Sequence, residues 1–342
     1  MLTVLSPRLK NIILFSAVLL GVSVTQLAHA DEIDTYSSFI SGEEYARAQS
    51  EDQTLLKGDA PSRSCFNFIV TQDYARAQSE AQTVLQWNSL GREDQRAAHL
   101  CLGLAYGNTG QANDAFTALV KTKSLSQSSW EHAIVNAALS RIYSQLDDLD
   151  KAELYDSLAL NAYKTFGAKG AQISVLNFLA SVVKDKKDEE RALALYQEAL
   201  SIGPNQPVTL NNIAMIYLQR NEYVKADELI HEALDIARHF HQADDVYRLQ
   251  INLGDSLRQQ GKLKEAKNEL MSGLKGLHLL TFKDKGWEAK ACRNLGALAK
   301  NQNKTSQARD WYVKAAGIYR ELGDETRANG MVEKISALGK SK

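Results

Sequence analysis

The chain has 342 residues, with 40 basic and 41 acidic side chains and a formal net charge of −1 at pH 7. No basic patch dominates this balance, so the composition speaks against a nucleic-acid-binding protein. The chain contains only four prolines, a number that suits a nearly all-helical protein because proline breaks helix interiors.

The first thirty residues have the pattern of a secretory signal peptide. Arg8 and Lys10 form a short positive region, an apolar run follows from 12 to 24, and the sequence Leu27-Ala-His-Ala30 places small residues at a cleavage site. We expect residues 1–30 to be removed and the protein to be exported, to the periplasm if the host is a Gram-negative bacterium. An uncleaved anchor is the alternative, although a membrane span needs about 20 apolar residues. No later stretch is apolar enough to span a bilayer.

Residues 31–61 contain the first copy of a duplicated segment. The sequence Tyr45-Ala-Arg-Ala-Gln-Ser-Glu51 recurs without change at Tyr74-Ala-Arg-Ala-Gln-Ser-Glu80. The second copy follows a stretch from 62 to 71 that has room for a first helix, so we assign it to a complete helix pair. The first copy lacks that room, and we expect it to form a lone helix or a half-unit. The sequence leaves open whether this segment is a dimerisation arm.

From residue 62 to 320 a two-helix pattern repeats around a small residue. Each unit has an apolar stripe at helical spacing, a small residue such as Gly103 where the second helix crosses, and a turn residue such as Gly110. The pattern predicts about seven stacked antiparallel helix pairs, followed over 321–342 by a capping helix with a polar outer side and a tail. An alanine marks each second helix at intervals of roughly 34 to 42 residues: Ala115, Ala152, Ala192, Ala226, Ala266 and Ala308.

This pattern resembles the tetratricopeptide repeat, in which a helix pair carries small residues at its crossing points. The longer spacings resemble the long-helix variant found in bacterial regulators and kinesin light chains. Some units depart from the pattern: the first-helix glycine is Ser140 in one unit and Ala180 in another. The resemblance implies an all-α fold, a right-handed α-solenoid that binds a protein or peptide in its concave groove and is not an enzyme. An irregular helical bundle is the alternative fold.

The resemblance also implies that the first helix of each unit lines the groove, so polar side chains there are candidates for contact with a bound peptide. Asparagine can pair with a peptide backbone because its amide has both donors and an acceptor. With Asp255 the single nearby acid on that face, we expect the C-terminal half of the groove to be basic and to prefer an acidic segment or a free carboxylate. The alternative is that the asparagines satisfy neighbouring helices and the basic side chains are only solvated. The candidates are Asn177, Asn211, Asn212, Arg248, Asn252, Arg258, Lys290, Arg293, Asn294 and Lys300.

The three cysteines are Cys65, Cys101 and Cys292. Cys65 and Cys101 fall on the first helices of consecutive units, which are neighbours in a stacked array. In an oxidising compartment we expect them to form a disulfide that joins the first repeat to the second. The alternative is a pair of buried free thiols. We expect Cys292 to be a free, buried thiol.

No motif points to catalysis, a cofactor or a metal. His231, Asp235 and His239 share a helix face, but their spacing is not a recognised metal-binding pattern, and a solvated face is the better interpretation. No phosphate-binding loop or nucleophile elbow occurs in the sequence. We therefore expect an interaction scaffold with a protein or peptide partner. The alternative is a ligand- or peptide-sensing module that acts through a membrane partner.

Overall fold

The computed structural model describes residues 65–69, 73–280 and 285–338. Within these ranges every regular element is a helix, as the sequence predicts. The predicted signal peptide, the first copy of the duplicated segment and the last four residues lie outside the described residues. The chain divides into two compact units, Met1–Pro204 and Asn205–Lys342, called unit 1 and unit 2 below and described separately.

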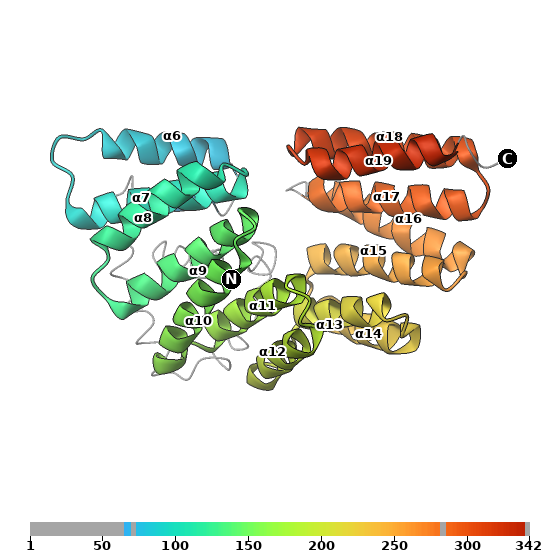
Figure 1. Cartoon of the computed structure of the whole chain (residues 1–342), viewed down its shortest axis with the longest axis horizontal. Helices are drawn as coiled ribbons and strands as arrows, with labels where there is room; N and C mark the ends of the chain where they lie inside the picture. Colours follow the sequence, from blue (N-terminus) through green and yellow to red (C-terminus); the bar gives the residue numbers. More distant parts are fainter. Residues whose placement is uncertain (1–64, 70–72, 281–284, 339–342) are drawn as a thin grey trace. The chain divides into compact units, whose positions relative to one another are not determined.

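Unit 1 begins, among the described residues, with a short helix over 65–69, and the longer helices follow as pairs joined by short turns (Figure 1). Each of these longer helices packs against the next along the chain, and the first helices of two consecutive pairs, α7 and α9, also touch. The helices are α6 (Tyr74–Leu85), α7 (Arg92–Asn108), α8 (Ala112–Leu125), α9 (Ser129–Gln145), α10 (Leu149–Thr165), α11 (Lys169–Asp185) and α12 (Glu189–Ile202).

Unit 2 contains three described pairs and a final helix that packs against α18. The first helices of its pairs, α13, α15 and α17, lie side by side (Figure 1). The helices are α13 (Pro207–Gln219), α14 (Tyr223–His239), α15 (Ala243–Gln259), α16 (Leu263–Leu279), α17 (Lys285–Asn301), α18 (Thr305–Glu321) and α19 (Glu325–Leu338).

The turn inside each described pair from α7 to α18 contains one residue with a left-handed backbone. The next residue donates its N–H back to the carbonyl oxygen of the first helix, for example from Gln111 to Tyr106 at 2.9 Å and from Lys262 to Leu257 at 2.9 Å. This bond satisfies a carbonyl that the helix end would otherwise leave unpaired. Glycine takes the position without strain in two pairs, and Asp, Lys or Asn fill it in the others. The residues are Gly110, Asp147, Lys187, Asn221, Gly261 and Asn303.

Small residues let the two helices of a pair approach closely. The six recurring alanines of the second helices are all 0% exposed. On the first helices, a Cβ added at Gly103 would lie 2.6 Å from the Leu119 side chain, and one at Gly296 would lie 2.6 Å from the Tyr312 ring. These close approaches explain why the sequence pattern repeats in register.

The helix α19 buries one side against unit 2 and presents the other to solvent. Ala328, Met331 and Leu338 are buried, and Ile335 packs against the same cluster. Val332, an apolar residue of the same helix, is 41% exposed. It lies on the side of α19 that carries mostly polar residues and that no described helix covers.

Candidate functional site

The solvent-facing residues of the first helices in unit 2 form a stripe that we call the first-helix stripe. Arg248, Asp255 and Arg258 are half-buried on α15, and Lys290, Arg293 and Ala297 are half-buried on α17 with Lys300 exposed. On α13 the stripe is Val208, Asn211 and Met215. The spacing of three or four residues keeps these side chains on one helix face, so six of the ten predicted contact residues lie on one surface.

Two of the predicted asparagines lie beneath this stripe and not on it. Asn252 is 1% exposed and Asn294 is 3% exposed. The Nδ2 group of Asn252 donates to Oδ1 of Asn211 at 2.7 Å, which joins α15 to α13. Both asparagines stand two residues before the crossing glycine, and at Asn252 this position is directed at the preceding first helix. The expectation that they face a groove is therefore corrected: the close packing of consecutive first helices covers them.

One helix pair of unit 1 uses the equivalent position for a contact between first helices. In unit 1, Phe178 of α11 lies 5.7 Å from the guanidinium carbon of Arg141 on α9. Asn212, the equivalent residue of α13, is half-buried. Asn177 precedes Phe178 by one residue and is half-buried, with an Oδ1 atom that is buried without a hydrogen-bond partner. Asn177 belongs to unit 1, so the structure does not bring it together with the stripe of unit 2.

The arginines of α15 are matched by carboxylates of the same helix. Arg248 Nη1 lies 3.5 Å from Asp244 Oδ2 and 3.5 Å from Asp245 Oδ1. Arg258 donates through Nε and Nη2 to Asp255 Oδ1 at 2.9 and 2.7 Å. The sequence reasoning counted Asp255 alone and missed the two buried aspartates in the first turn of the helix. Their spacing of three and four residues from Arg248 is the signal that could have revealed them.

The uncompensated positive charge of the stripe therefore lies on α17. Arg293 Nε donates to Oδ1 of Asn294 at 3.3 Å, and Lys300 is exposed. Among the described residues, neither Arg293 nor Lys300 makes an ion pair. Lys290 places its ammonium group 4.3 Å from the centre of the Trp287 ring. The predicted basic end of the surface therefore lies on α17 alone and not on both α15 and α17.

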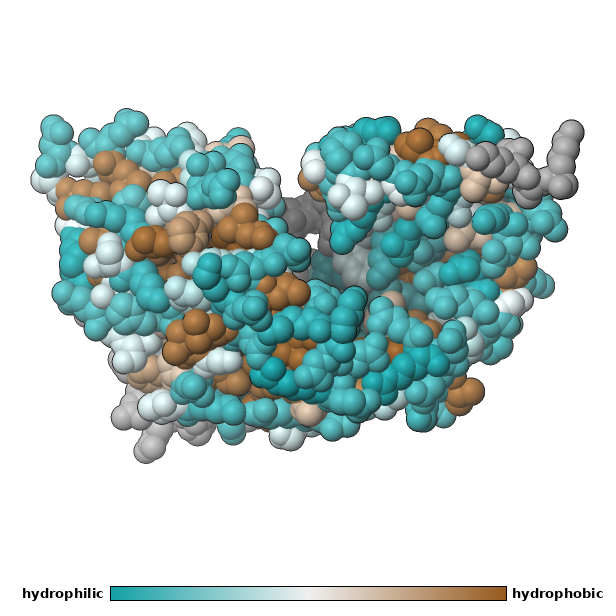
Figure 2. All heavy atoms as spheres, viewed as in Figure 1, coloured by the Kyte–Doolittle hydropathy of each residue, from teal (hydrophilic) through white to brown (hydrophobic). Residues whose placement is uncertain are grey.

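Burial raises the pKa of the Tyr312 phenol on α18, and the positive charges of Arg258 and Arg293 oppose that shift. In the view of Figure 2, the surface over α13 to α18 is mostly hydrophilic. A partner that binds there would depend on polar and charged contacts.

The buried polar atoms of this region that lack a hydrogen-bond partner among the described residues include Oδ1 of Asn252 and Nδ2 of Asn294, an acceptor on α15 and a donor on α17. An unpaired buried polar group costs about 1–3 kcal/mol.

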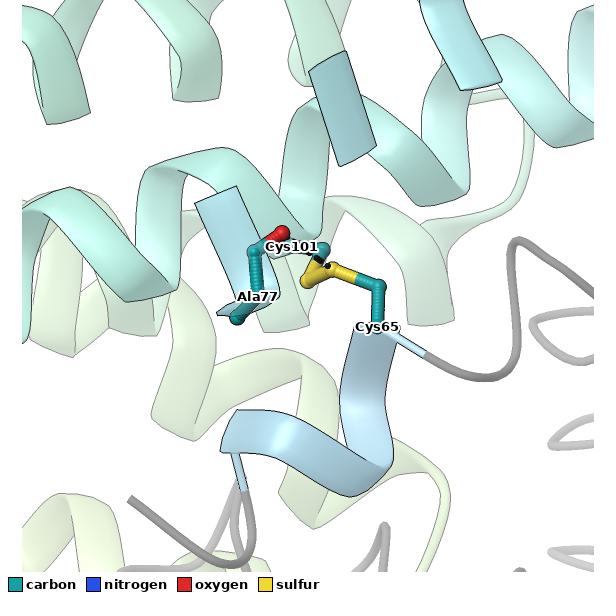
Figure 3. Close-up of a disulfide and its surroundings, with 3 residues drawn as sticks. All are labelled: Cys65, Ala77 and Cys101. Carbon is teal, nitrogen blue, oxygen red and sulfur yellow. Dashed lines mark hydrogen bonds between the residues drawn. A yellow bond between two sulfur atoms is a disulfide. The ribbon is translucent and has the colours of Figure 1, made fainter. Parts of the chain in front are cut away.

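Cys65 and Cys101 form a disulfide with a Cα–Cα distance of 6.4 Å (Figure 3). Both cysteines are 0% exposed, and the Cys65 sulfur lies 3.1 Å from the carbonyl oxygen of Ala77 in α6. The bond joins the short helix over 65–69 to α7. Cys292 is a free, buried cysteine, and burial raises the pKa of its thiol to about 11.

The described residues contain no group of three or more potential ligands that could hold a metal ion. His231 is exposed, and its Nδ1 atom lies 2.7 Å from the carbonyl oxygen of Asp227. Asp235 Oδ1 lies 3.6 Å from Arg238 Nη1, and the His239 ring packs edge-on against the Phe240 ring. No helix in the described part of the chain is long and apolar enough to cross a membrane.

Stacked helix pairs with small residues at each crossing define an α-solenoid repeat protein. The tetratricopeptide repeat model matches residues 205–277, from just before α13 into α16. Over these residues the chain matches the tetratricopeptide repeat, as its sequence pattern predicts.

Similar solved structures share this fold. A Rap protein complexed with Competence and Sporulation Factor is 12% identical, with a TM-score of 0.60 and coverage of 98% of each chain. The apo quorum sensor NprR from B. thuringiensis is 15% identical, with a TM-score of 0.56 and coverage of 97% of this chain and 98% of that one. NprR in complex with its cognate peptide NprX is also 15% identical, with a TM-score of 0.56 and coverage of 90% and 96%.

One curated relative is similar in sequence. It is the peroxisomal targeting signal receptor of Saccharomyces cerevisiae, which is 25% identical over 211 residues. The match covers 60% of this chain and 31% of the receptor, so the chain spans less than a third of that relative.

Proposed function

We propose that this protein is a non-catalytic interaction scaffold and that the first-helix stripe of unit 2 docks a peptide or an extended segment of a partner protein. The observation that carries the proposal is the charge of α17, where Arg293 and Lys300 share one face without a carboxylate partner among the described residues. The similar structures of a Rap protein complexed with Competence and Sporulation Factor and of NprR in complex with its cognate peptide NprX support the same type of ligand.

In this proposal an extended segment lies across α13, α15 and α17. Its acidic group meets Arg293 and Lys300, because arginine suits the geometry of a carboxylate. Arg248 and Arg258 contribute less to the affinity, since their charges are already balanced by Asp244, Asp245 and Asp255. Exposed charges are screened by salt, so binding should weaken as ionic strength rises above about 0.1 M.

Export is part of the proposal. The N-terminal pattern of a signal peptide motivates it, and the Cys65–Cys101 disulfide supports it, because such bonds persist mainly in oxidising compartments. If the host is a Gram-negative bacterium, the scaffold would act in the periplasm.

The test is crosslinking in cells followed by affinity capture. We expect Arg293→Glu/Lys300→Glu to lose a partner that the wild-type protein captures, because both substitutions place negative charge where an acidic group would bind. The matched control is Lys267→Glu/Lys275→Glu, which makes the same charge change at exposed positions of α16. Capture of the same partner by both variants would contradict the proposal and move the interaction to another surface.

A further inference from the structure

Three equivalent positions on the first helices of unit 2 differ in chemical character. Each lies one residue after the small residue at which the two helices of a pair cross, and all three are half-buried. Because α13, α15 and α17 lie side by side, these positions form a row across the helices (Figure 1). The row consists of Met215, Asp255 and Ala297, so it changes from apolar to acidic to small.

The α17 end of the row has a small residue between two positive charges. Ala297 lies four residues after Arg293 and three before Lys300, so the three side chains share one helix face. Among the described residues, neither Arg293 nor Lys300 makes an ion pair, and the Arg293 guanidinium donates only to the neutral amide of Asn294. An acidic side chain placed over Ala297 would therefore meet both positive charges.

The middle of the row carries balanced charge. Arg258 donates through Nε and Nη2 to Oδ1 of Asp255 at 2.9 and 2.7 Å. Gln259 donates to Oδ2 of the same carboxylate at 3.3 Å. A charged ligand residue would gain little over α15, because the two opposite charges there offset each other. An uncharged stretch of the ligand fits this part of the row.

The α13 end of the row is apolar. Met215 is half-buried, and the residues at helical spacing on the same face of α13 are Val208, Asn211 and Gln219, none of which is charged. The flexible thioether side chain of methionine adapts to apolar groups of different shape. An apolar side chain of a ligand could therefore pack against Met215, whereas an acidic one would find no positive charge on that face.

The spacing of the helices sets the distance between these two contacts. Packed helices lie about 8–10 Å apart, so α13 and α17 lie about 16–20 Å apart. An extended chain rises about 3.3 Å per residue and covers that distance in about five or six residues. Its side chains point alternately to opposite sides, so only an even separation directs both contact residues to the protein.

We propose that the ligand of the first-helix stripe is an extended segment with two contact residues, an acidic one over Ala297 and an apolar one against Met215. The two residues lie an even number of positions apart in its sequence, about six. This inference rests on the proposed function, because it specifies the ligand of the same surface. The separation between acid and apolar residue, and not the net charge alone, would then decide which segments bind.

The first test selects random dodecapeptides displayed on phage against the purified full chain. We expect an acidic and an apolar residue about six positions apart to be enriched over the odd separations on either side, because an odd separation turns one residue away. Enrichment of acidic peptides without a preferred separation would overturn this inference and leave the docking surface standing. If no peptide were enriched, or if Arg293→Glu/Lys300→Glu bound the enriched peptides equally well, both proposals would fail.

The second test assigns each contact residue of the ligand to its place, using the most enriched peptide with a fluorescein label and anisotropy as the readout. Ala297→Leu should weaken binding about tenfold, because leucine fills the space between the two bases, and Met215→Gln should weaken it by a similar factor. Changing the acid of the peptide to its amide should remove the effect of Ala297→Leu alone. Changing the apolar residue to serine should remove the effect of Met215→Gln alone.

Two control variants detect general damage to the surface. Met215→Leu keeps an apolar side chain and should retain the affinity within about twofold. Lys267→Glu/Lys275→Glu makes the charge change at exposed positions of α16 and should leave binding unchanged. The peptide substitutions do not alter the protein, so they test the inference even where a variant fails to fold. Equal affinity of the original, amide and serine peptides for the wild type would overturn it.

Discussion

At the scale of single residues, Asp156 is a buried carboxyl group that the sequence reasoning did not identify. It is 1% exposed on α10, and its Oδ2 atom has no hydrogen-bond partner among the described residues. Burial raises the pKa of Asp156 from 3.8 to about 7, while hydrogen bonding by Ser140 and the charge of Arg141 oppose the shift. The folded state therefore favours the protonated carboxyl group of Asp156. The contribution of this group to the free energy of unfolding falls as pH rises from about 4 towards 7.

We predict that Asp156→Asn makes the melting temperature less dependent on pH. Asparagine mimics the protonated carboxyl, so the variant should gain about 1–3 kcal/mol of stability over the wild type at pH 8 relative to the same comparison at pH 5. Thermal melts at both pH values measure this difference. The control is Asp235→Asn, whose side chain is 79% exposed. A constant difference between wild type and Asp156→Asn across the pH range would contradict the predicted pKa shift.

The burial of Asn252 changes what its substitution should do. A groove residue could be truncated without loss of stability, but the amide of Asn252 is buried and donates to Asn211. We predict that Asn252→Ala lowers the free energy of unfolding by about 1–2 kcal/mol, because the bond between α15 and α13 is lost. Denaturant unfolding of unit 2 measures the effect, with Lys300→Ala as an exposed control that should change it by less than about 0.5 kcal/mol. If the wild type and Asn252→Ala had equal free energies of unfolding, Asn252 would again be a candidate for contact with a ligand.

At the scale of elements, the disulfide stabilises the first described helices of unit 1. The short helix over 65–69 contributes Phe66 and Ile69 to the core, and the bond to Cys101 closes a loop with a sequence separation of 36. We predict that Cys65→Ser/Cys101→Ser raises the hydrogen-exchange rate of 65–69 and α6, with a loss of up to about 3–4 kcal/mol by the chain-entropy estimate. Exchange in α15 to α18 should stay unchanged. An equal rise in the hydrogen-exchange rate in both units, or no rise in α6, would refute this local role of the disulfide.

The turns inside the helix pairs show which backbone conformations the local sequence can predict and which it cannot. Gly110 and Gly261 predict left-handed turns because glycine adopts that backbone without strain. Lys187 adopts the same conformation with a φ of 71°, although nothing in its side chain favours it. Its conformation follows from the packing of α11 on α12, which requires the same turn geometry as in the other pairs.

At the scale of the whole molecule, the predicted fold class is confirmed, and the predicted repeat type is confirmed where its family model matches, over residues 205–277. Both predictions rest on a periodic pattern of small and apolar residues. The predicted division into segment, repeats and cap stays a prediction. The division into two units at Pro204 was not predicted. The sequence there contains Gly203 and Pro204, but these residue types indicate a turn and do not by themselves show where a compact unit ends.

The sequence could predict only part of the candidate surface, and the reason is physical. Sequence periodicity shows which residues share a helix face, so it placed Arg293 and Lys300 together on α17. It does not show which of two adjacent positions points to solvent and which points to the preceding helix. Only the packing of consecutive first helices buried Asn252 and Asn294.

The amino-acid sequence by itself determined the helix pairs, their crossing points and their repeat, because these depend on contacts between residues close together in the chain. The tertiary structure alone decided which of the candidate side chains remain accessible. Asn252 and Asn294 are covered because consecutive first helices pack against each other. Burial depends on neighbours in space, and those neighbours come together only when the helices stack.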